Sequence, residues 1–229
     1  MDRTPEPELM DEPRQARAYA LADFDEPNTR FLNLFDALAG STAGSGHVAD
    51  LGCGPADIAM RLLERWPNCT VDAVDGSPEM IRQAAERLTP ALSARLRLVE
   101  AALPSDRLED DVYDYVISNS LLHHLHDPSV LWDTVKRVAK DDARVLVVDL
   151  IRPPSVDRAK EIVTLYAGEE PPILQRDFYN SLLAAFEVDE VRHQLTAAGL
   201  DHLQVSVISD RHLAVSGVMT PSFQPYSTT

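Results

Sequence analysis

Two glycines one residue apart stand where a short apolar run ends and a helix-forming run begins. Gly52 and Gly54 follow the run His47–Leu51, which contains Asp50, and Pro55 suits the first turn of a helix. Glycines let the backbone bend sharply and approach a bound molecule closely. In an open parallel sheet, ligands bind outside the carboxyl ends of the strands, so we expect this turn to border a binding site. A turn that merely joins strand to helix is the alternative.

The charge beside the turn separates two classes of ligand. A GxG turn also opens the fingerprint of dinucleotide sites, but Asp57 occupies the sixth position, where that fingerprint has a small residue. Asp50 and Asp57 would place negative charge near a pyrophosphate, which binds best at an unobstructed helix N-terminus. S-adenosyl-L-methionine carries an ammonium, a carboxylate and a sulfonium but no phosphate. The acidic turn therefore favours S-adenosyl-L-methionine as the cofactor.

A further carboxylate ends the next apolar run. Asp75 closes Thr70–Asp75, and a carboxylate at this place can accept hydrogen bonds from both ribose hydroxyls of an adenosine. The alternative is that Asp75 only favours the N-terminus of the helix that Ser77-Pro78 begins. Because Asp75 follows the glycine turn at a suitable spacing, we favour the binding role.

Four motifs in this order resemble those of the class I S-adenosylmethionine-dependent methyltransferases of the small-molecule type. The resemblance covers roughly His47 to Val218, and its motifs are Asp50-Leu51-Gly52-Cys53-Gly54, Val74-Asp75, Leu98-Val99-Glu100-Ala101 and Tyr113-Asp114-Tyr115-Val116-Ile117-Ser118-Asn119. It implies transfer of a methyl group from S-adenosyl-L-methionine to an acceptor. The chain departs from the family pattern at Ala56, which replaces a third glycine, and at Glu100, where the family often has Asp.

The resemblance also assigns parts of the cofactor to residues. It implies that Asp50, Gly52 and Gly54 line the methionine end, and that Asp75, with Gly76 beside it, holds the ribose. The other cofactor contacts that it implies lie at the adenine or beneath the cofactor, and they are Met80, Glu100, Ala101, Asn119, Ser120 and Leu121.

Three histidines follow the fourth apolar run, where an acceptor would meet the methyl group. They are His123, His124 and His126. Imidazole is a common metal ligand, but this segment has no acidic or cysteine partner at helical spacing, so we expect no metal. His124 is the candidate general base, with His123 and His126 as acceptor contacts. A structural role for at least two of the three is the alternative, because positioning alone can drive methyl transfer.

The segment between the fifth apolar run and the last helix is too long for a simple connection. Two helices are expected in it, Asp157–Tyr166 and Phe178–Phe186. Long insertions near strand ends commonly cap a pocket, so we expect acceptor contacts from this segment and from the helical region before the glycine turn. The candidates are Tyr19, Tyr166, Arg176, Phe178 and Tyr179. Arg176 would bind a carboxylate of the acceptor, and a surface arginine is the alternative.

The elements that must position these residues follow from an alternation of apolar runs and helix-length segments. The strands expected are His47–Leu51, Thr70–Asp75, Arg95–Glu100, Tyr113–Ser118 and Ala143–Leu150. Such spacing predicts right-handed crossovers and a doubly wound, mostly parallel sheet. Two further alternating runs, His202–Ile208 and His212–Val218, predict a C-terminal antiparallel hairpin. The fold class is therefore α/β, a seven-stranded Rossmann-like methyltransferase fold.

This pattern divides the chain into four parts. Residues 1–14 are polar and Pro-rich and are expected to form a mobile tail, and residues 15–46 a helical preface. Residues 47–218 form the methyltransferase domain, with a lid-like insertion at 152–187. Residues 219–229 are expected to form a C-terminal tail.

Composition narrows the partners. The chain has 37 acidic against 21 basic residues and a net charge of −16, so polyanions are repelled at long range. Nucleic acid and membrane surfaces are therefore not expected as partners, and a small-molecule acceptor is. Cys53 and Cys69 lack CxxC spacing, which predicts neither disulfides nor a zinc site and fits a cytoplasmic protein. The sequence leaves the oligomeric state and the acceptor atom (O, N, S or C) open.

Two other functions stay open at this point. A non-catalytic accessory protein would bind S-adenosyl-L-methionine but lack a working acceptor pocket. A nicotinamide-dependent oxidoreductase would share the glycine turn, although Asp57 disfavours its pyrophosphate.

Overall fold

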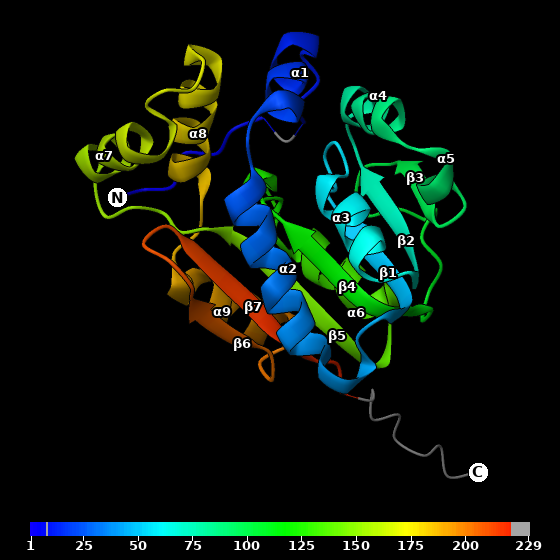
Figure 1. Cartoon of the computed structure of the whole chain (residues 1–229). Helices are drawn as coiled ribbons and strands as arrows, with labels where there is room; N and C mark the ends of the chain where they lie inside the picture. Colours follow the sequence, from blue (N-terminus) through cyan, green and yellow to red (C-terminus); the bar gives the residue numbers. More distant parts are fainter. Residues whose placement is uncertain (8, 221–229) are drawn as a thin grey trace.

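A seven-stranded sheet forms the centre of the protein (Figure 1), and the computed structural model describes residues 1–7 and 9–220. The strand order is β3-β2-β1-β4-β5-β7-β6. The strands are β1 (Ser45–Leu51), β2 (Asn68–Asp75), β3 (Leu96–Glu100), β4 (Tyr113–Asn119), β5 (Ala139–Leu150), β6 (Gln204–Val207) and β7 (His212–Val218). Strands β1 to β5 pair in parallel, and β7 runs antiparallel to both β5 and β6. The predicted doubly wound sheet and its C-terminal hairpin are confirmed.

Helices cover both faces of this sheet. One face packs against α2 and α3, with α4 and α5 at the β3 edge, and the other face packs against α6 and α9. The bounds of these helices are α2 (Asp25–Ala39), α3 (Asp57–Arg65), α4 (Pro78–Arg87), α5 (Pro90–Ser93), α6 (Ser129–Val138) and α9 (Val188–Ala198). Two 3₁₀ turns, η1 (Gly40–Thr42) and η2 (Leu122–His124), follow α2 and β4.

Strand β5 shows why the central strands are apolar without interruption. Val145 and Val147 belong to the core with α6 and α9, whereas Leu146 and Val148 belong to the core with α2 and α3. Successive side chains point to opposite faces, so a strand buried on both faces needs apolar residues at every position.

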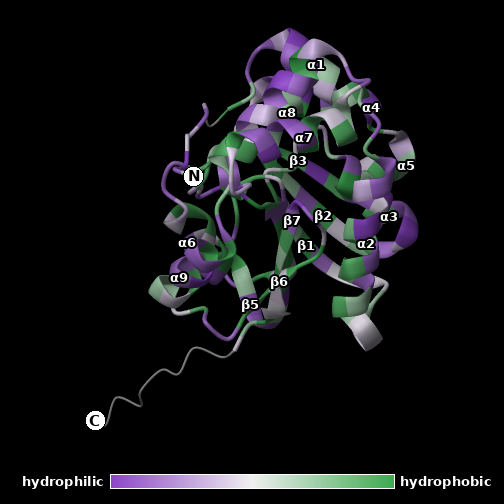
Figure 2. Cartoon of the chain, turned by 90° about the vertical axis from the view of Figure 1, so that its left-hand side faces the viewer, coloured by the Kyte–Doolittle hydropathy of each residue, from purple (hydrophilic) through white to green (hydrophobic). Residues whose placement is uncertain are grey.

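The insertion forms a helical pair above the carboxyl ends of the strands. Helices α7 (Val156–Ala167) and α8 (Pro172–Ala184) share a small core of their own, built from Ile162, Leu182 and Leu150 of β5. Helix α8 begins six residues before the predicted start, because Pro172 occupies its first turn. In Figures 1 and 2 this pair lies beside α1 (Pro13–Leu21), at the same end of the molecule.

The first residues of the chain are packed, which corrects the expectation of a mobile tail. The Arg3 side chain donates to the carbonyl oxygens of Ala184 (2.6 Å), His123 (2.9 Å) and Leu125 (3.0 Å). Further along, the Ser77 hydroxyl donates to the Met10 carbonyl at 2.9 Å. The segment therefore runs from α8 to the start of α4. We call residues 1–7 and 9–12 the N-terminal strap.

The far end of the chain differs from expectation in one described residue. Met219 was assigned to the C-terminal tail, but its side chain is buried and its amide donates to the Ala143 carbonyl at 2.7 Å. Residues 221–229 of that tail lie outside the described residues. Among the helices that are described, none is long and apolar enough to cross a membrane.

Candidate active site

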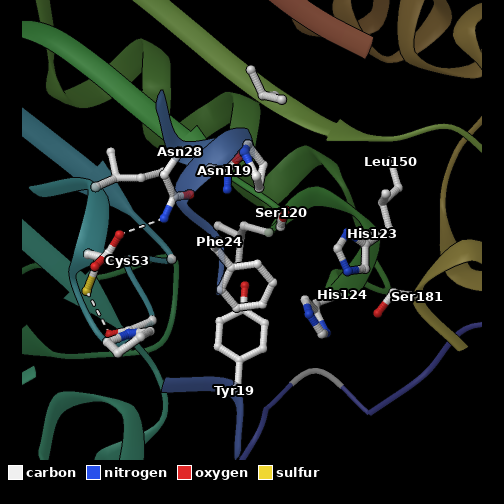
Figure 3. A pocket seen from close by; sticks show the side chains of 18 of the residues that line it. Tyr19, Phe24, Asn28, Cys53, Asn119, Ser120, His123, His124, Leu150 and Ser181 are labelled. Atoms are coloured by element: carbon white, nitrogen blue, oxygen red, sulfur yellow. Dashed lines mark hydrogen bonds between the residues drawn. The ribbon is translucent and has the colours of Figure 1, made fainter. Parts of the chain in front are cut away.

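A cavity of about 500 Å³ lies at the carboxyl ends of β1, β2, β4 and β5. Its walls come from the glycine turn, the loops after β2 to β4, helices α1 and α2, and the inner face of the insertion. Figure 3 shows Tyr19 and Phe24 together on one side, with His123, His124 and Ser181 on another. The predicted cofactor residues and the predicted acceptor residues therefore line one cavity.

The glycine turn at the end of β1 is held tightly to β2. The amides of Gly52 and Cys53 both donate to the Val74 carbonyl, at 2.8 and 2.9 Å. Gly52 has a φ of +72°, and a Cβ there would lie 2.8 Å from the Leu121 side chain. Gly54 has a φ of +53°, and its Cβ would meet only Tyr19, at 3.9 Å. Gly52 is therefore needed for packing, while Gly54 leaves its backbone open to the cavity.

Two carboxyl groups lie beside the turn, those of the buried Asp50 and the half-buried Asp75. Asp75 accepts hydrogen bonds from the Gly54 amide at Oδ2 and the Ser77 amide at Oδ1, both at 2.8 Å. Burial raises the pKa of Asp75, and these two bonds offset the rise only in part. Burial and then the charge of Asp75 raise the pKa of Asp50 to about 7. Both acids lack a positive partner among the described residues, so this end of the cavity favours a cation.

The sequence analysis expected Asp57 to place negative charge near the ligand, and this expectation needs correction. Burial raises its pKa, but hydrogen bonds from Arg87 and Asn28, together with Arg61, bring that pKa below its ordinary value. Its oxygens lie 2.6 Å from Arg61 Nε and 2.5 Å from an Arg87 nitrogen. Asp57 is therefore neutralised by its neighbours and ties α2, α3 and α4 together. The preference for a cation comes from Asp50 and Asp75.

Most residues that the sequence assigned to the cofactor line this cavity. These are Asp50, Gly52, Gly54, Asp75, Gly76, Met80, Ala101, Asn119, Ser120 and Leu121. Glu100 is not among the lining residues. It ends β3 beside Asp75 with an exposed side chain, and the neighbouring Ala101 lines the cavity in its place.

The three histidines after β4 separate in the structure. His123 is buried, and its Nδ1 lies 2.6 Å from Asp149 Oδ1, while Asp149 Oδ2 accepts the Leu122 amide at 2.8 Å. His124 also lines the cavity, and burial lowers its pKa to about 3. His126 is exposed and lies outside the cavity lining, with its Nε2 2.9 Å from the Glu6 carbonyl oxygen. The cavity therefore receives two of the three imidazoles.

Helix α8 presents one face to the cavity. Leu174, Asp177, Phe178 and Ser181 line it, and these positions recur at the spacing of a single helix face. Arg176 does not share this face, so its predicted contact with an acceptor is not supported. Its side chain is exposed and pairs with Asp177 at 3.2 Å.

Of the other residues of α1 and the insertion that were predicted to contact the acceptor, three line the cavity and one does not. Tyr19, Tyr166 and Phe178 line the cavity. Tyr179 packs instead against the small core of α7 and α8 and is absent from the lining.

Several lining residues were missed by sequence reasoning. From α2 and its approach come Phe24, Asn28 and Phe31, and from the insertion and the β6–β7 turn come Asp177, Ser181, Arg211 and His212. Helix periodicity counted from Phe178 would have found Asp177 and Ser181. The sequence holds no comparable signal for the turn between β6 and β7. This turn lies at the cavity because β7 is next to β5 in the sheet.

The strand order, the antiparallel β7 and the glycine turn after β1 together define the Rossmann-like methyltransferase fold. A methyltransferase from Aquifex aeolicus has the same fold with a TM-score of 0.66, at 17% identity, over 91% of this chain and 99% of that chain. The plantazolicin methyltransferase BpumL, solved with a triazolic desmethylPZN analog and SAH, gives a TM-score of 0.69 at 14% identity, over 90% of each chain.

The sequence comparisons place the match in the same region. Residues 48–146 match the family model of a methyltransferase domain. Trans-aconitate 2-methyltransferase of Mycobacterium tuberculosis (strain ATCC 25177 / H37Ra) is 39% identical over 84 residues, which are 37% of this chain and 29% of the relative. The Mycobacterium ulcerans (strain Agy99) enzyme is 33% identical over 121 residues, 52% of this chain and 42% of the relative. The matches thus span less than half of these relatives. Residues 48–146 thus match a methyltransferase domain, and the whole chain has the fold of S-adenosylmethionine-dependent methyltransferases.

Proposed function

We propose that this protein transfers the methyl group of S-adenosyl-L-methionine to a small-molecule acceptor. The observation that carries the proposal is the single cavity of about 500 Å³ that runs from Asp75 and the glycine turn to His123 and the insertion. Pockets for small ligands commonly measure about 300–1,000 Å³, so this volume suits a cofactor and a compact acceptor.

The residues at the cofactor end fit the proposed cofactor chemically. Asp50 is buried and Asp75 is half-buried, and a sulfonium or an ammonium would stabilise the charge of both acids. Each Asp75 oxygen carries one hydrogen bond from the backbone and keeps capacity for a ribose hydroxyl. The open side of Gly54 allows close approach of the cofactor to the backbone.

When bound, the cofactor would supply a methyl group on a positively charged sulfur, which is an activated leaving group. In such a transfer the acceptor atom would bond to the methyl carbon as the carbon–sulfur bond breaks, and the electron pair of that bond would stay on sulfur. The task of this chain is therefore to hold the acceptor in line and to exclude water. Tyr166 and Phe178 of the insertion supply walls for that purpose.

A general base is a smaller part of the proposal. His124 was the candidate, but its lowered pKa of about 3 means that it holds a proton weakly. Positioning by the cavity walls is therefore the contribution that we propose for catalysis.

The acceptor of the curated relatives is not carried over to this chain. The two arginines that line the cavity already have partners: Arg30 lies 2.5 Å from Glu26, and Arg211 lies 3.0 Å from Asp210 and stacks over Tyr166. A tricarboxylate such as trans-aconitate would need to displace these pairs. We therefore propose an acceptor with fewer negative charges.

The test combines cofactor binding with product formation. We expect isothermal titration to give micromolar affinity for S-adenosylmethionine and S-adenosylhomocysteine, and we expect Asp75→Ala to lose at least tenfold in affinity. Glu64→Ala is the matched control, because Glu64 is an exposed acid outside the cavity lining. Undetectable binding of both ligands to the wild type would contradict the proposal.

Methyl transfer is then measured with a labelled methyl group and a panel of small acceptors. The panel includes amines, alcohols, thiols and monocarboxylates, with trans-aconitate as the comparator. Binding without any product across the panel would favour the non-catalytic accessory protein. A titration with NADH, in which we expect no binding, tests the oxidoreductase.

A further inference from the structure

Three side chains from distant parts of the sequence meet beside the acceptor end of the cavity. Glu6 Oε1 of the N-terminal strap lies 3.7 Å from His123 Nε2 and 3.5 Å from His124 Nδ1. All three ligand atoms lie within 4.8 Å of one another. An ion with bonds of about 2.1 Å to tetrahedral ligands keeps those ligands about 3.4 Å apart. The cluster therefore has close to the spacing that a single small cation requires.

The two imidazoles are oriented for this purpose by their other nitrogen atoms. Asp149 lies 2.6 Å from Nδ1 of His123, which leaves Nε2 directed at Glu6. His124 has a hydrogen bond to the backbone of Pro7, and its Nδ1 is directed at Glu6. A carboxylate or carbonyl behind each ligating histidine is the usual arrangement around protein-bound metals.

The cluster also contains a polar atom that lacks a partner. Within residues 1–7 and 9–220, the buried atom His124 Nδ1 has no hydrogen-bond partner, and neither does Oδ2 of the buried Asp177, which also lines the cavity. Nearly all buried polar atoms in proteins find a partner, so these two atoms indicate a missing group. An imidazole nitrogen with a free lone pair next to a carboxylate fits a cation.

We propose that Glu6, His123 and His124 form a binding site for one divalent transition-metal ion, such as Zn²⁺, at the acceptor end of the cavity. Two imidazoles and one carboxylate are a donor set that zinc and related ions accept, and three protein ligands leave a fourth position open. His123 and His124 line the cavity, so that position faces the space where the acceptor is proposed. There the ion would bind an oxygen or nitrogen atom of the acceptor.

The site has a structural consequence that does not depend on activity. Glu6 belongs to the N-terminal strap, whereas His123 and His124 belong to η2, so the ion would fasten the strap across the cavity. Apart from the two histidines, the Glu6 carboxylate accepts a hydrogen bond from the Ser181 hydroxyl, at 2.9 Å. Metal binding should therefore slow hydrogen exchange in the strap.

The experiment measures metal binding without cofactor or acceptor. The full chain is stripped with EDTA, dialysed and titrated with Zn²⁺ and, separately, with Co²⁺, whose visible absorption reports tetrahedral ligands. We expect one ion per chain and an affinity at least tenfold weaker in Glu6→Gln and in His124→Gln. His193→Gln is the matched control, because His193 is an exposed histidine on α9 away from the cluster, and it should bind like the wild type.

The outcomes separate the proposal from its alternatives. Circular dichroism spectra confirm that each variant is folded, and hydrogen exchange of residues 1–7 should slow on adding Zn²⁺ in the wild type but not in Glu6→Gln. No stoichiometric binding by the wild type, or equal binding by all variants, would overturn the metal site. Either result would leave the proposed methyl transfer intact, because cofactor binding is measured independently.

Discussion

Asp50 carries a carboxyl group whose protonation is balanced at neutral pH. Its side chain is buried, and burial together with the charge of Asp75 raises its pKa to about 7. A cation bound beside Asp50 favours the carboxylate, so cation binding and deprotonation of Asp50 are linked. At the scale of single residues, the cofactor end of the cavity therefore depends on pH.

We expect the affinity for S-adenosylmethionine to rise roughly tenfold between about pH 5.5 and pH 7. Below its pKa of about 7, Asp50 is protonated in the free protein, and part of the binding energy is used to remove that proton. Above that pH the affinity should level off. Isothermal titration across this range checks the expectation, and Asp50→Asn should flatten the profile. An unchanged profile in that variant would assign the dependence to another group.

The two glycines of the turn should respond differently to alanine. Gly52→Ala combines a left-handed φ with a Cβ 2.8 Å from Leu121, so we expect it to lower the free energy of unfolding by more than about 2 kcal/mol. Gly54→Ala has the strain without the clash and should cost about 1 kcal/mol, but its methyl group enters the cavity and should weaken cofactor binding. Urea unfolding and titration measure the two effects.

Gly199 supplies the control for backbone strain. It has a φ of +72° at the end of α9, and a Cβ there meets no atom within 4 Å. Gly199→Ala should therefore cost about 1 kcal/mol and leave cofactor affinity unchanged. If Gly52→Ala cost no more than this control, the contact with Leu121 would be unimportant.

At the scale of elements, a polar cluster around the buried Asp72 joins the four adjacent strands β1 to β4. Asp72 of β2 receives two hydrogen bonds from Arg97 of β3, at 2.8 and 2.6 Å, and one from Tyr113 of β4, at 2.6 Å. His47 Nε2 of β1 lies 3.2 Å from the same carboxylate. The cluster therefore supports the observed register, in which Asp72 pairs with Arg97 and Ala49.

The stability that Asp72 provides should disappear in acid. Burial raises its pKa, but the hydrogen bonds from Arg97, His47 and Tyr113 bring that pKa far below its ordinary value. A carboxyl group with a lowered pKa in the folded state stabilises the fold above its unfolded pKa of about 3.9, and this stabilisation is lost as the pH falls below it.

We therefore expect Asp72→Asn to lower the free energy of unfolding by about 2 kcal/mol at pH 7, discounted for the half-exposed Arg97. The difference from the wild type should shrink as the pH falls below about 4. Urea unfolding at several pH values measures it, with the exposed Asp201→Asn as control. A difference that did not change with pH would mean that packing, and not charge, gives Asp72 its effect.

At the scale of the whole molecule, the N-terminal strap connects parts of the chain that the sheet keeps apart. Arg3 bonds to carbonyl oxygens of α8 and of the η2 region, and its guanidinium lies 4.0 Å from the centre of the Phe186 ring. The amide of Thr4 donates to the Leu183 carbonyl at 3.0 Å. The insertion and the loop after β4 are therefore held together by residues outside both.

Arg3→Ala should release this connection without unfolding the sheet. The loss of charged hydrogen bonds worth about 2 kcal/mol in total would speed hydrogen exchange at the Thr4 amide by at least tenfold. Exchange in β4 and β5 should stay unchanged. Arg14→Ala, an exposed arginine of α1, is the control. Equal protection of Thr4 in Arg3→Ala and wild type would show that other contacts hold the strap.

The same scale explains what the sequence could and could not predict. Alternating apolar runs predicted the strands, and Ser77-Pro78 predicted the start of a helix, because these signals are local. The strap was wrongly expected to be mobile, because its partners lie more than a hundred residues away and Arg3 gives no local pattern. Glu6 escaped notice for the same reason. The predicted acceptor contact of Arg176 is not supported, because Arg176 lies on a face of α8 that points away from the cavity. Which face of α8 points inward is determined by the packing of the insertion and not by the local sequence.

The path of the strap also sets an order of events during synthesis. Residues 1–7 leave the ribosome before their partners in η2 and α8, which extend to Ala184. At a translation rate of about 5–20 residues per second, these first residues wait roughly 10–40 seconds for the surface that they bind. The cavity therefore gains one of its walls late, when a segment made early binds a surface that is completed only after β1 to β5 have been made.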